Sequence, residues 1–424
     1  MALFNAESLS IFQFKEFRWF VAARFFLTLA IQMQMSTISL QAYYEFPYYG
    51  EIKNVLALGM IGLAEAIPFI LTSFFSGIIA DTINRRKILI VTIFALFVGC
   101  LLLFLFSYET TQFLRSFGIL TLFGIVFLFG IIRSFIAATT HPFMSQIVPR
   151  SQYTNSSTWN STFWHIGAIA GPIVSGIIYG YNNGLHADWC YGINCVLFLL
   201  ALFFIMRIKS KPMPEKQEGE TLIESMKVGL KFVFNNKMVL SALSLDLFAV
   251  LFGGAVALIP AFTDQVLHLG PSAIGLLRTS PAVGAVLMAF VLAVRPPGKN
   301  AGSWLLWSVV LFGVFTILFA ISTNYWLAFT MLMMTGAFDN ISVVVRHSIM
   351  QLSTPDHMRG RVAAINSIFI GSSNEIGAFE SGFTARLMGL VPSIIFGGGM
   401  VVAVVIGIDR LNPKLKKLDL TKIE

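Results

Sequence analysis

Charged residues are scarce in this chain. Only 12% of its 424 residues are Asp, Glu, Lys or Arg, whereas roughly a quarter of a soluble domain is charged. Hydrophobic residues make up 56% of the sequence, 41 residues are Phe, and the mean hydropathy is +0.77. No soluble fold hides that much apolar surface. The composition therefore excludes a soluble protein and indicates one embedded in lipid.

The sequence patterns of catalysis are also missing. There is no Gly-x-x-x-x-Gly-Lys-Ser/Thr loop for nucleotide phosphates, no His-Glu-x-x-His zinc pair and no Gly-x-Ser-x-Gly nucleophile elbow. These absences argue against an enzyme and an ATP-driven pump. A channel or receptor would need a continuous pore or a ligand domain, and the sequence indicates neither. We expect no catalytic residue, no cofactor and no metal site.

Three cysteines carry little information. Cys190 and Cys195 lie near the outer end of a predicted span, and the sequence leaves open whether they are bonded.

Apolar runs dominate what is present. Twelve of them have about the 17–25 residues that a helix needs to cross a bilayer. We expect spanning helices at residues 19–41, 55–79, 88–107, 116–139, 160–180, 190–206, 238–261, 271–294, 303–321, 325–349, 362–386 and 391–408. The predicted fold class is an all-α membrane protein with twelve transmembrane helices.

The sequence also repeats itself once. Residues 61–68 (IGLAEAIP) recur as residues 274–281 (IGLLRTSP). Two homologous six-helix halves of the same orientation are typical of a transporter that rocks around a site between its halves. We divide the chain into an N-terminal six-helix bundle (1–206), a cytoplasmic linker with an amphipathic helix (207–237) and a C-terminal six-helix bundle with a basic tail (238–424).

The net charge of +8 follows the predicted topology. Most Lys and Arg residues fall in loops on the side of both termini, and only Lys53 and Arg115 fall in loops on the other side. Cytoplasmic loops keep Lys and Arg, so both termini are expected in the cytoplasm and the charge indicates no nucleic acid. In the linker, apolar residues from Ile223 to Phe234 recur at helical spacing. This pattern predicts a helix on the cytoplasmic membrane surface, or a tether of fixed length. The tail from Asp409 is expected to be a solvated basic end.

A glycine, an acid and a basic turn occur together between the second and third spans. Gly77 is followed by Asp81 at a helix end and by Arg85 and Arg86. Such a group can lock two helices through charge-assisted hydrogen bonds and release them, which makes it a candidate conformational gate. A loop that only sets topology is the alternative. The segment resembles the Gly-x-x-x-Asp-x-x-x-Arg-Arg-Lys signature of the major facilitator superfamily, which implies two pseudo-symmetric six-helix bundles.

The fifth span is rich in glycine. Gly167 and Gly171, and Gly176 and Gly180, are pairs of small residues that permit close helix packing, and Pro172 removes a backbone donor. The segment looks like the glycine-proline motif of facilitator-family antiporters, which implies export rather than uptake. Generic helix packing remains the alternative.

A second resemblance involves residues 359–377 and residues 62–65 (Gly-Leu-Ala-Glu). These segments resemble the bacterial drug-and-siderophore exporter branch of the superfamily, which includes the enterobactin exporter and macrolide efflux proteins. The resemblance covers essentially the whole chain and implies export of a small molecule without identifying it.

Ionisable groups inside apolar helices are costly, which makes them functional candidates. In the superfamily, spans one, four, seven and ten line the central cavity. By that resemblance the cavity would receive Arg24, Arg133, Asp246, Asp339 and Arg346. Basic groups there would suit an anionic or zwitterionic substrate. Arg133 and Arg346 lie near helix ends, however, where snorkelling to lipid phosphates is the alternative. The substrate-cavity candidates are Arg24, Arg133, Arg278, Arg346, His165 and Asn374, and a packing role is the alternative for His165.

Acidic side chains in the spans are candidates for carrying a proton. Spans two and eleven pack together in this fold, and a carboxyl group removed from water can exchange protons near neutrality. Proton-coupled antiport needs such a group, although static pairing with Arg278 is the alternative. In order of preference, the proton-coupling candidates are Glu65, Glu375, Asp339, Asp246 and Glu380.

The sequence thus predicts a proton-coupled exporter of an amphipathic small molecule, a siderophore or a drug, that works by alternating access. The alternatives on the same fold are a lysophospholipid or lipid flippase and a facilitator-type importer. The expected partners are the substrate, protons and the lipid bilayer. We expect a monomer in the bacterial cytoplasmic (inner) membrane.

Overall fold

A computed structural model describes residues 10–46, 55–108, 118–212, 222–295, 297–355 and 358–419. Within these ranges every regular element is a helix, which confirms the predicted all-α membrane fold. The chain divides into two compact units. Unit 1 consists of Met1–Pro47, Ile67–Gln217 and Gly270–Leu276, and unit 2 consists of Tyr48–Ala66, Glu218–Leu269 and Leu277–Glu424.

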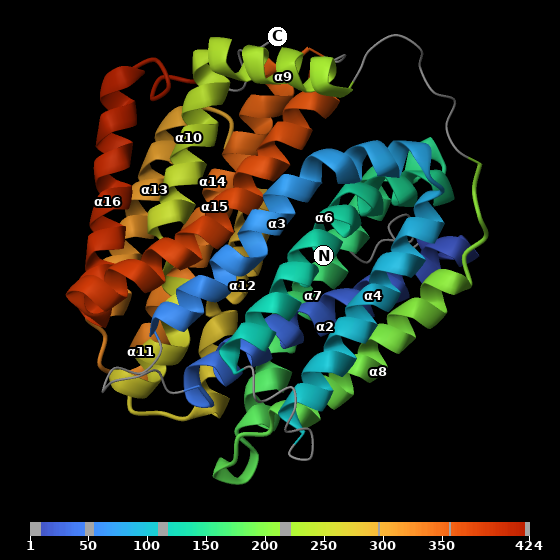
Figure 1. The fold of residues 1–424 in the computed structure, drawn as a ribbon. Helices are drawn as coiled ribbons and strands as arrows, with labels where there is room; N and C mark the ends of the chain where they lie inside the picture. Colours follow the sequence, from blue (N-terminus) through green and yellow to red (C-terminus); the bar gives the residue numbers. More distant parts are fainter. Residues whose placement is uncertain are drawn as a thin grey trace. The chain divides into compact units, whose positions relative to one another are not determined.

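Unit 1 is a bundle of long helices. They are α2 (Lys15–Tyr44), the part of α3 (Val55–Thr82) after Ile67, α4 (Arg85–Ser107), α6 (Ile119–Ile147), α7 (Tyr153–Tyr179) and α8 (Ala187–Met206). Short 3-10 turns occur at η2 (Ser10–Gln13), η3 (Arg150–Gln152) and η4 (Tyr181–Asn183). α2 packs against both α7 and α8, while α4 packs against α6 and α8. In Figure 1 these helices run from blue to green.

Unit 2 contains the first part of α3 and the remaining helices. These are α9 (Leu222–Asn235), α10 (Lys237–Phe252), η5 (Gly254–Leu258), α11 (Ile259–Gln265), α12 (Pro271–Val294), α13 (Ala301–Ala320), α14 (Tyr325–Ser353), α15 (Arg359–Met388) and α16 (Leu390–Leu411). α13 packs against α14 and α16, and α10 packs against α15. The largest described core of this unit joins buried residues of α10, α13, α14 and α16, such as Leu245, Leu305, Val345 and Val401.

Eleven helical segments of the described chain are long and apolar enough to cross a membrane. The remaining predicted span, residues 362–386, lies in α15, which has 30 residues. Polar residues along it, such as Asn366, Asn374 and Glu375, lower its hydropathy, which explains why composition alone does not mark α15 as a span. Several helices also extend beyond the predicted limits, most clearly α6, which continues through Pro142 to Ile147.

The predicted span at residues 238–261 lies within one candidate membrane span, Lys237–Gln265, but the helix of this span is interrupted. α10 ends at Phe252, a 3-10 turn follows, and α11 begins at Ile259. Gly253 and Gly254 lie at the break, and a side chain on Gly254 would meet the Gly377 carbonyl oxygen at 2.6 Å. Pro260 then lacks a backbone N–H, which suits the first turn of a new helix. Close packing and proline together explain the interruption.

Part of the apolar face of α9 packs against protein. Val233 is fully buried, and Leu230 packs with it against a cluster that includes Leu243 of α10 and Ile365 of α15. Protein thus covers Leu230 and Val233, whereas Phe234 of the same predicted face is 58% exposed, and the helix on the membrane surface stays a prediction. The predicted helix start at Thr221 lies outside the described residues.

The basic tail is also more ordered than a solvated end. Leu415 is fully buried, and the backbone N–H of Gly302 in α13 donates to the Leu418 carbonyl at 3.3 Å. The Asn412 side chain donates to the Lys237 carbonyl and to the Ser241 hydroxyl. The described tail is therefore part of unit 2.

Candidate functional site

α10 and α14 bring an acid and a base together inside unit 2. The Arg346 guanidinium forms an ion pair with the Asp246 carboxylate, and the two residues are only 2% and 5% exposed. Asp246 lies on the buried face of α10 with Ala242 and Ala249. Packing of that face against α14 thus places the carboxylate beside the arginine. Arg346 is directed into the bundle, which leaves no role for snorkelling to lipid.

The pairing of Arg346 leaves part of its donor capacity unused. A guanidinium has five N–H donors, and the Nε–H of Arg346 has no hydrogen-bond partner among the described residues. A buried ion pair is costly to desolvate and strongly destabilising when one partner is removed. An arginine with unused N–H donors can bind a second anionic group.

Asp339 lies two turns before Arg346 on α14. It makes no ion pair with any residue that the structure describes, and the Oδ1 atom of the neighbouring Asn340 is buried without a partner there. One turn earlier, Gly336 packs directly on the Pro281 carbonyl of α12. These contacts hold a polar segment of α14 within unit 2.

A second set of charges lies where the first part of α3 meets α15. A side chain on Gly62 would meet the Glu375 carbonyl oxygen at 2.7 Å, so the two helices cross closely. Glu65, one turn further along α3, is 1% exposed. Arg278 of α12 interacts electrostatically with Glu375. The structure thus brings together three of the predicted residues and places Arg278 as the electrostatic partner of Glu375.

The other candidates on α15 are more peripheral. Glu380 is half-buried. Asn374 is exposed, and its side chain donates to the Ile370 carbonyl of its own helix at 2.8 Å. Asn374 therefore adjoins Glu375 in the chain, but its side chain is exposed and bonded to its own helix.

Unit 1 contains its own charged residues. Arg24 of α2 has a buried Nε–H without a partner among the described residues, and its charge acts on His141 of α6. His141 was not predicted, because a single histidine near a helix end gives no distinct signal. Arg133 is half-buried on α6, and the His165 ring lies 5.0 Å from the Trp164 ring.

The candidate gate links three helices of unit 1. Arg85 donates to the carbonyl oxygens of Ala80 and Pro142 and to the Asp81 carboxylate. Arg86 donates to the Met206 carbonyl at the end of α8 at 2.7 Å. Asp81 itself is largely exposed. The basic turn therefore connects the end of α3 to α6 and α8, while the space beside Gly77 is open among described atoms.

The glycines of α7 lie at close helix crossings. Side chains on Gly167 and Gly171 would meet α2 at 3.1 and 2.8 Å, and one on Gly176 would meet Gly275 at 2.7 Å. The Pro172 carbonyl also faces Gly275. The packing role of these residues is thus visible in the contacts.

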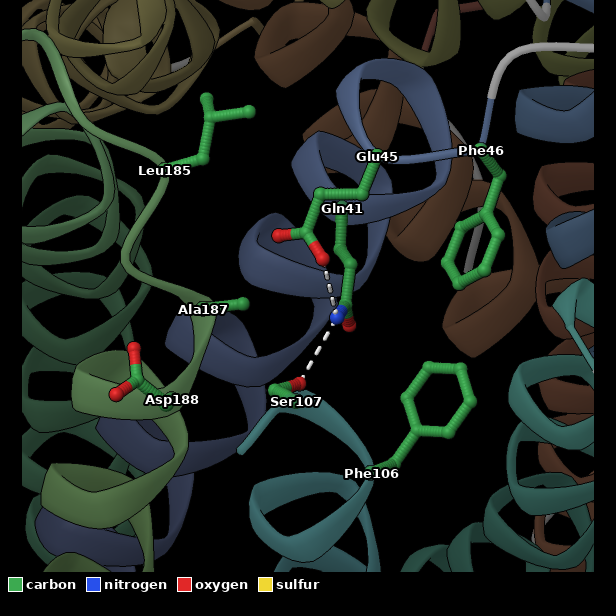
Figure 2. A pocket seen from close by; sticks show the side chains of 8 residues that line it. All are labelled: Gln41, Glu45, Phe46, Phe106, Ser107, Leu185, Ala187 and Asp188. Carbon is green, nitrogen blue, oxygen red and sulfur yellow. Dashed lines mark hydrogen bonds between the residues drawn. The ribbon is translucent and has the colours of Figure 1, made fainter. Parts of the chain in front are cut away.

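A buried polar network closes the opposite end of unit 1. The Gln41 side chain donates to Glu45 at 3.0 Å and to the Ser107 hydroxyl at 2.8 Å. The Tyr191 hydroxyl donates to Gln41 at 2.8 Å, and the Tyr179 hydroxyl donates to Glu45 at 2.9 Å. Figure 2 shows the Gln41 side chain between Glu45 and Ser107. The network joins the ends of α2, α4 and α7 to α8.

A cavity of about 420 Å³ adjoins this network, and it is shown in Figure 2. It is lined by Gln41, Glu45, Phe46, Phe106, Ser107, Leu185, Ala187 and Asp188. The sequence did not predict it, since polar residues at the end of a span look like an ordinary helix end.

The structure also answers the question of a disulfide bond, because Cys190 and Cys195 are free thiols.

Comparison with known proteins gives this arrangement a family. A major facilitator model described as "Transmembrane secretion effector" matches residues 51–424. The chain belongs to this family. It is therefore a multi-pass membrane transporter rather than an enzyme, as the sequence predicted.

Curated relatives lie in the drug and siderophore exporter branch. The chain is 22% identical to the Staphyloferrin A transporter of Staphylococcus aureus, over 86% of this chain and 89% of that one. It is 21% identical to the multidrug efflux pump Tap of Mycolicibacterium fortuitum, over 87% and 90%. It is 20% identical to an enterobactin exporter, EntS, of Escherichia coli, over 76% and 75%.

Solved structures show the same fold at low identity. A D-xylose–proton symporter matches with a TM-score of 0.74 and 13% identity, over 96% of this chain and 100% of that one. A bacterial homologue of the iron transporter ferroportin matches with a TM-score of 0.70 and 16% identity, over 95% and 99%. These neighbours include importers, so they establish the fold alone.

Proposed function

We propose that this protein is a proton-coupled exporter of an amphipathic small molecule, a siderophore or a drug, that works by alternating access in the bacterial cytoplasmic membrane with both termini in the cytoplasm. The three named relatives are a staphyloferrin A transporter, a multidrug efflux pump and an enterobactin exporter, which supports outward transport. The Gly-Pro segment of α7 fits the same direction.

The observation that carries the proposal is the buried ion pair between Asp246 and Arg346. Placing two charges inside a spanning bundle is expensive, and such groups mark proton and substrate pathways. A substrate anion that occupies the unused donors of Arg346 would compete with Asp246 for the guanidinium. Proton binding to the released carboxylate would then couple to substrate binding.

The second charge group supplies the proton carrier. Glu65 is 1% exposed beside α15, and the charge of Arg278 acts on Glu375. A carboxyl group in this position changes its proton affinity when its neighbours move. We therefore assign Glu65 as the first proton-coupling residue and Glu375 as the second, with Asp339, Asp246 and Glu380 following.

The test is proton movement in proteoliposomes that contain the purified protein and a pH-sensitive dye. Siderophores and drugs are added on each side in turn, and Glu65→Gln is compared with the unaltered protein. Glu16→Gln is the matched control, because Glu16 pairs with Lys211 at the surface. We expect substrate-dependent proton movement that is lost in Glu65→Gln and kept in Glu16→Gln.

Three outcomes would contradict parts of the proposal. Proton movement that survives Glu65→Gln moves the carrier to Glu375 or Asp339. Proton and substrate movement in the same direction identifies an importer. Labelled lysolipid that crosses the bilayer without proton movement identifies a flippase.

A further inference from the structure

A groove opens on the outside of α13 and α14 in unit 2. It has a volume of about 410 Å³, and it is lined by Asn300, Ser303, Trp304, Trp307, Ser308, Leu311, Phe338 and Ile341. Trp304 and Trp307 are 46% and 61% exposed, one turn apart on the same helix face. Indole rings of this kind gather at the level of lipid headgroups.

The groove has a polar end and an apolar end. Asn300 and Ser303 lie at the start of α13, whereas Leu311 and Phe338 lie deeper. From Ser303 to Leu311 the helix rises about 12 Å at 1.5 Å per residue. The ring of Phe338 stacks with Phe315 at 5.4 Å, which fixes the deep wall. This shape suits a molecule with a polar head and an alkyl chain.

The C-terminal tail is held beside the polar end. The Ser303 hydroxyl donates to the Lys416 carbonyl at 2.9 Å, and Gly302 donates to the Leu418 carbonyl. Burial of Leu415 anchors the same turn. Figure 1 shows this red segment turning back after α16. The tail backbone is therefore fixed directly against a residue that lines the groove.

This tail concentrates positive charge. Residues 409–419 contain four basic residues, Arg410, Lys414, Lys416 and Lys417, and two acids, Asp409 and Asp419, and Lys299 precedes the groove residue Asn300. The three tail lysines and Lys299 are exposed. Basic groups at the polar end of a lipid-facing groove attract anionic headgroups, with about 1 kcal/mol for each Lys near the surface.

We propose that the groove binds an anionic phospholipid of the bilayer, with its phosphate at the Ser303 and Lys416 end and an acyl chain along Trp304, Trp307 and Leu311. None of the residues that line this site is among the charged residues assigned to transport, and its test does not depend on transport activity.

The experiment is native mass spectrometry of the purified protein with added phosphatidylglycerol, cardiolipin or phosphatidylcholine. Lys416→Ala combined with Lys417→Ala removes two exposed charges. The matched control is Lys227→Ala with Lys231→Ala, which removes two exposed charges from α9 of the same unit. We expect the tail variant to bind the anionic lipids roughly thirtyfold more weakly, about 2 kcal/mol for two lysines, and the α9 variant to bind them as the unaltered protein does.

A second comparison tests the apolar wall. Trp307→Ala is expected to lose bound anionic lipid, whereas Trp326→Ala, which removes an equally exposed indole at the start of α14, is expected to retain it. Equal retention in all variants would overturn the proposal. Equal binding of phosphatidylcholine would also overturn it, because the groove would then not select lipids by charge. Displacement of the lipid by inorganic phosphate alone would overturn it as well, because the site would then be a simple anion site.

Discussion

Replacing Asp246 with Asn would remove the partner of Arg346 while leaving the shape of the site almost unchanged. Arg346 is 2% exposed and cannot reach water without reorganisation of α14. An uncompensated buried charge of this kind costs about 3–5 kcal/mol. At about 2–4 °C per kcal/mol for a unit of this size, the apparent melting temperature should fall by roughly 6–20 °C.

The assay is thermal unfolding of purified variants in one detergent, arranged as a double-mutant cycle. Asp246→Asn and Arg346→Met are measured singly and together, because the double variant removes both buried charges. We expect the double variant to recover most of the loss. Asp339→Asn is the control, since Asp339 has no ion pair among the described residues. A melting temperature for Asp246→Asn equal to that of the control, or no recovery in the double variant, would refute the reasoning.

Three further predictions concern unit 1. Gly171→Val should abolish a monodisperse folded protein in size-exclusion chromatography, because the side chain would collide with the α2 backbone, whereas Gly77→Val should not, because its surroundings are open. Gln41→Leu should destabilise the protein by about 1–3 kcal/mol in thermal unfolding, since it leaves several buried partners without a hydrogen bond. Arg85→Gln should slow substrate-dependent proton movement about fivefold or more while the melting temperature changes little, because it breaks the link to Pro142 in α6. An unchanged rate would show that the basic turn only sets topology.

Much of the fold could be predicted from the sequence, because long apolar runs report directly on spanning helices. The break at Gly253 and Gly254 could not, since it depends on the backbone of Gly377 in another helix. The packing of Leu230 and Val233 of α9 against α10 and α15 could not be predicted for a similar reason. An amphipathic pattern shows that a helix has an apolar face, and it does not show whether lipid or protein covers that face.

The sequence could predict which residues belong to the candidate site, but it could not predict which of them pair with one another. Asp246 and Arg346 stood out as ionisable groups in apolar helices, but their contact depends on the rotation of α10 and α14 about their axes. The sequence predicts pairing with Arg278 as an alternative, but it does not identify Glu375 as the acid with which Arg278 interacts. The hydrogen-bond network around Gln41 could not be predicted from the sequence, because its members are far apart in the chain and none of them belongs to a recognisable motif.

The C-terminal turn has a consequence for how the protein is made. The first turn of α13 uses the carbonyl oxygens of Lys416 and Leu418, and Ser303 and Lys416 are 113 residues apart in the chain. Domains generally form in order of synthesis, yet this helix start can be completed only after α14, α15 and α16 have also been made. A truncation before Asn412 would therefore leave the first turn of α13 without these two acceptors.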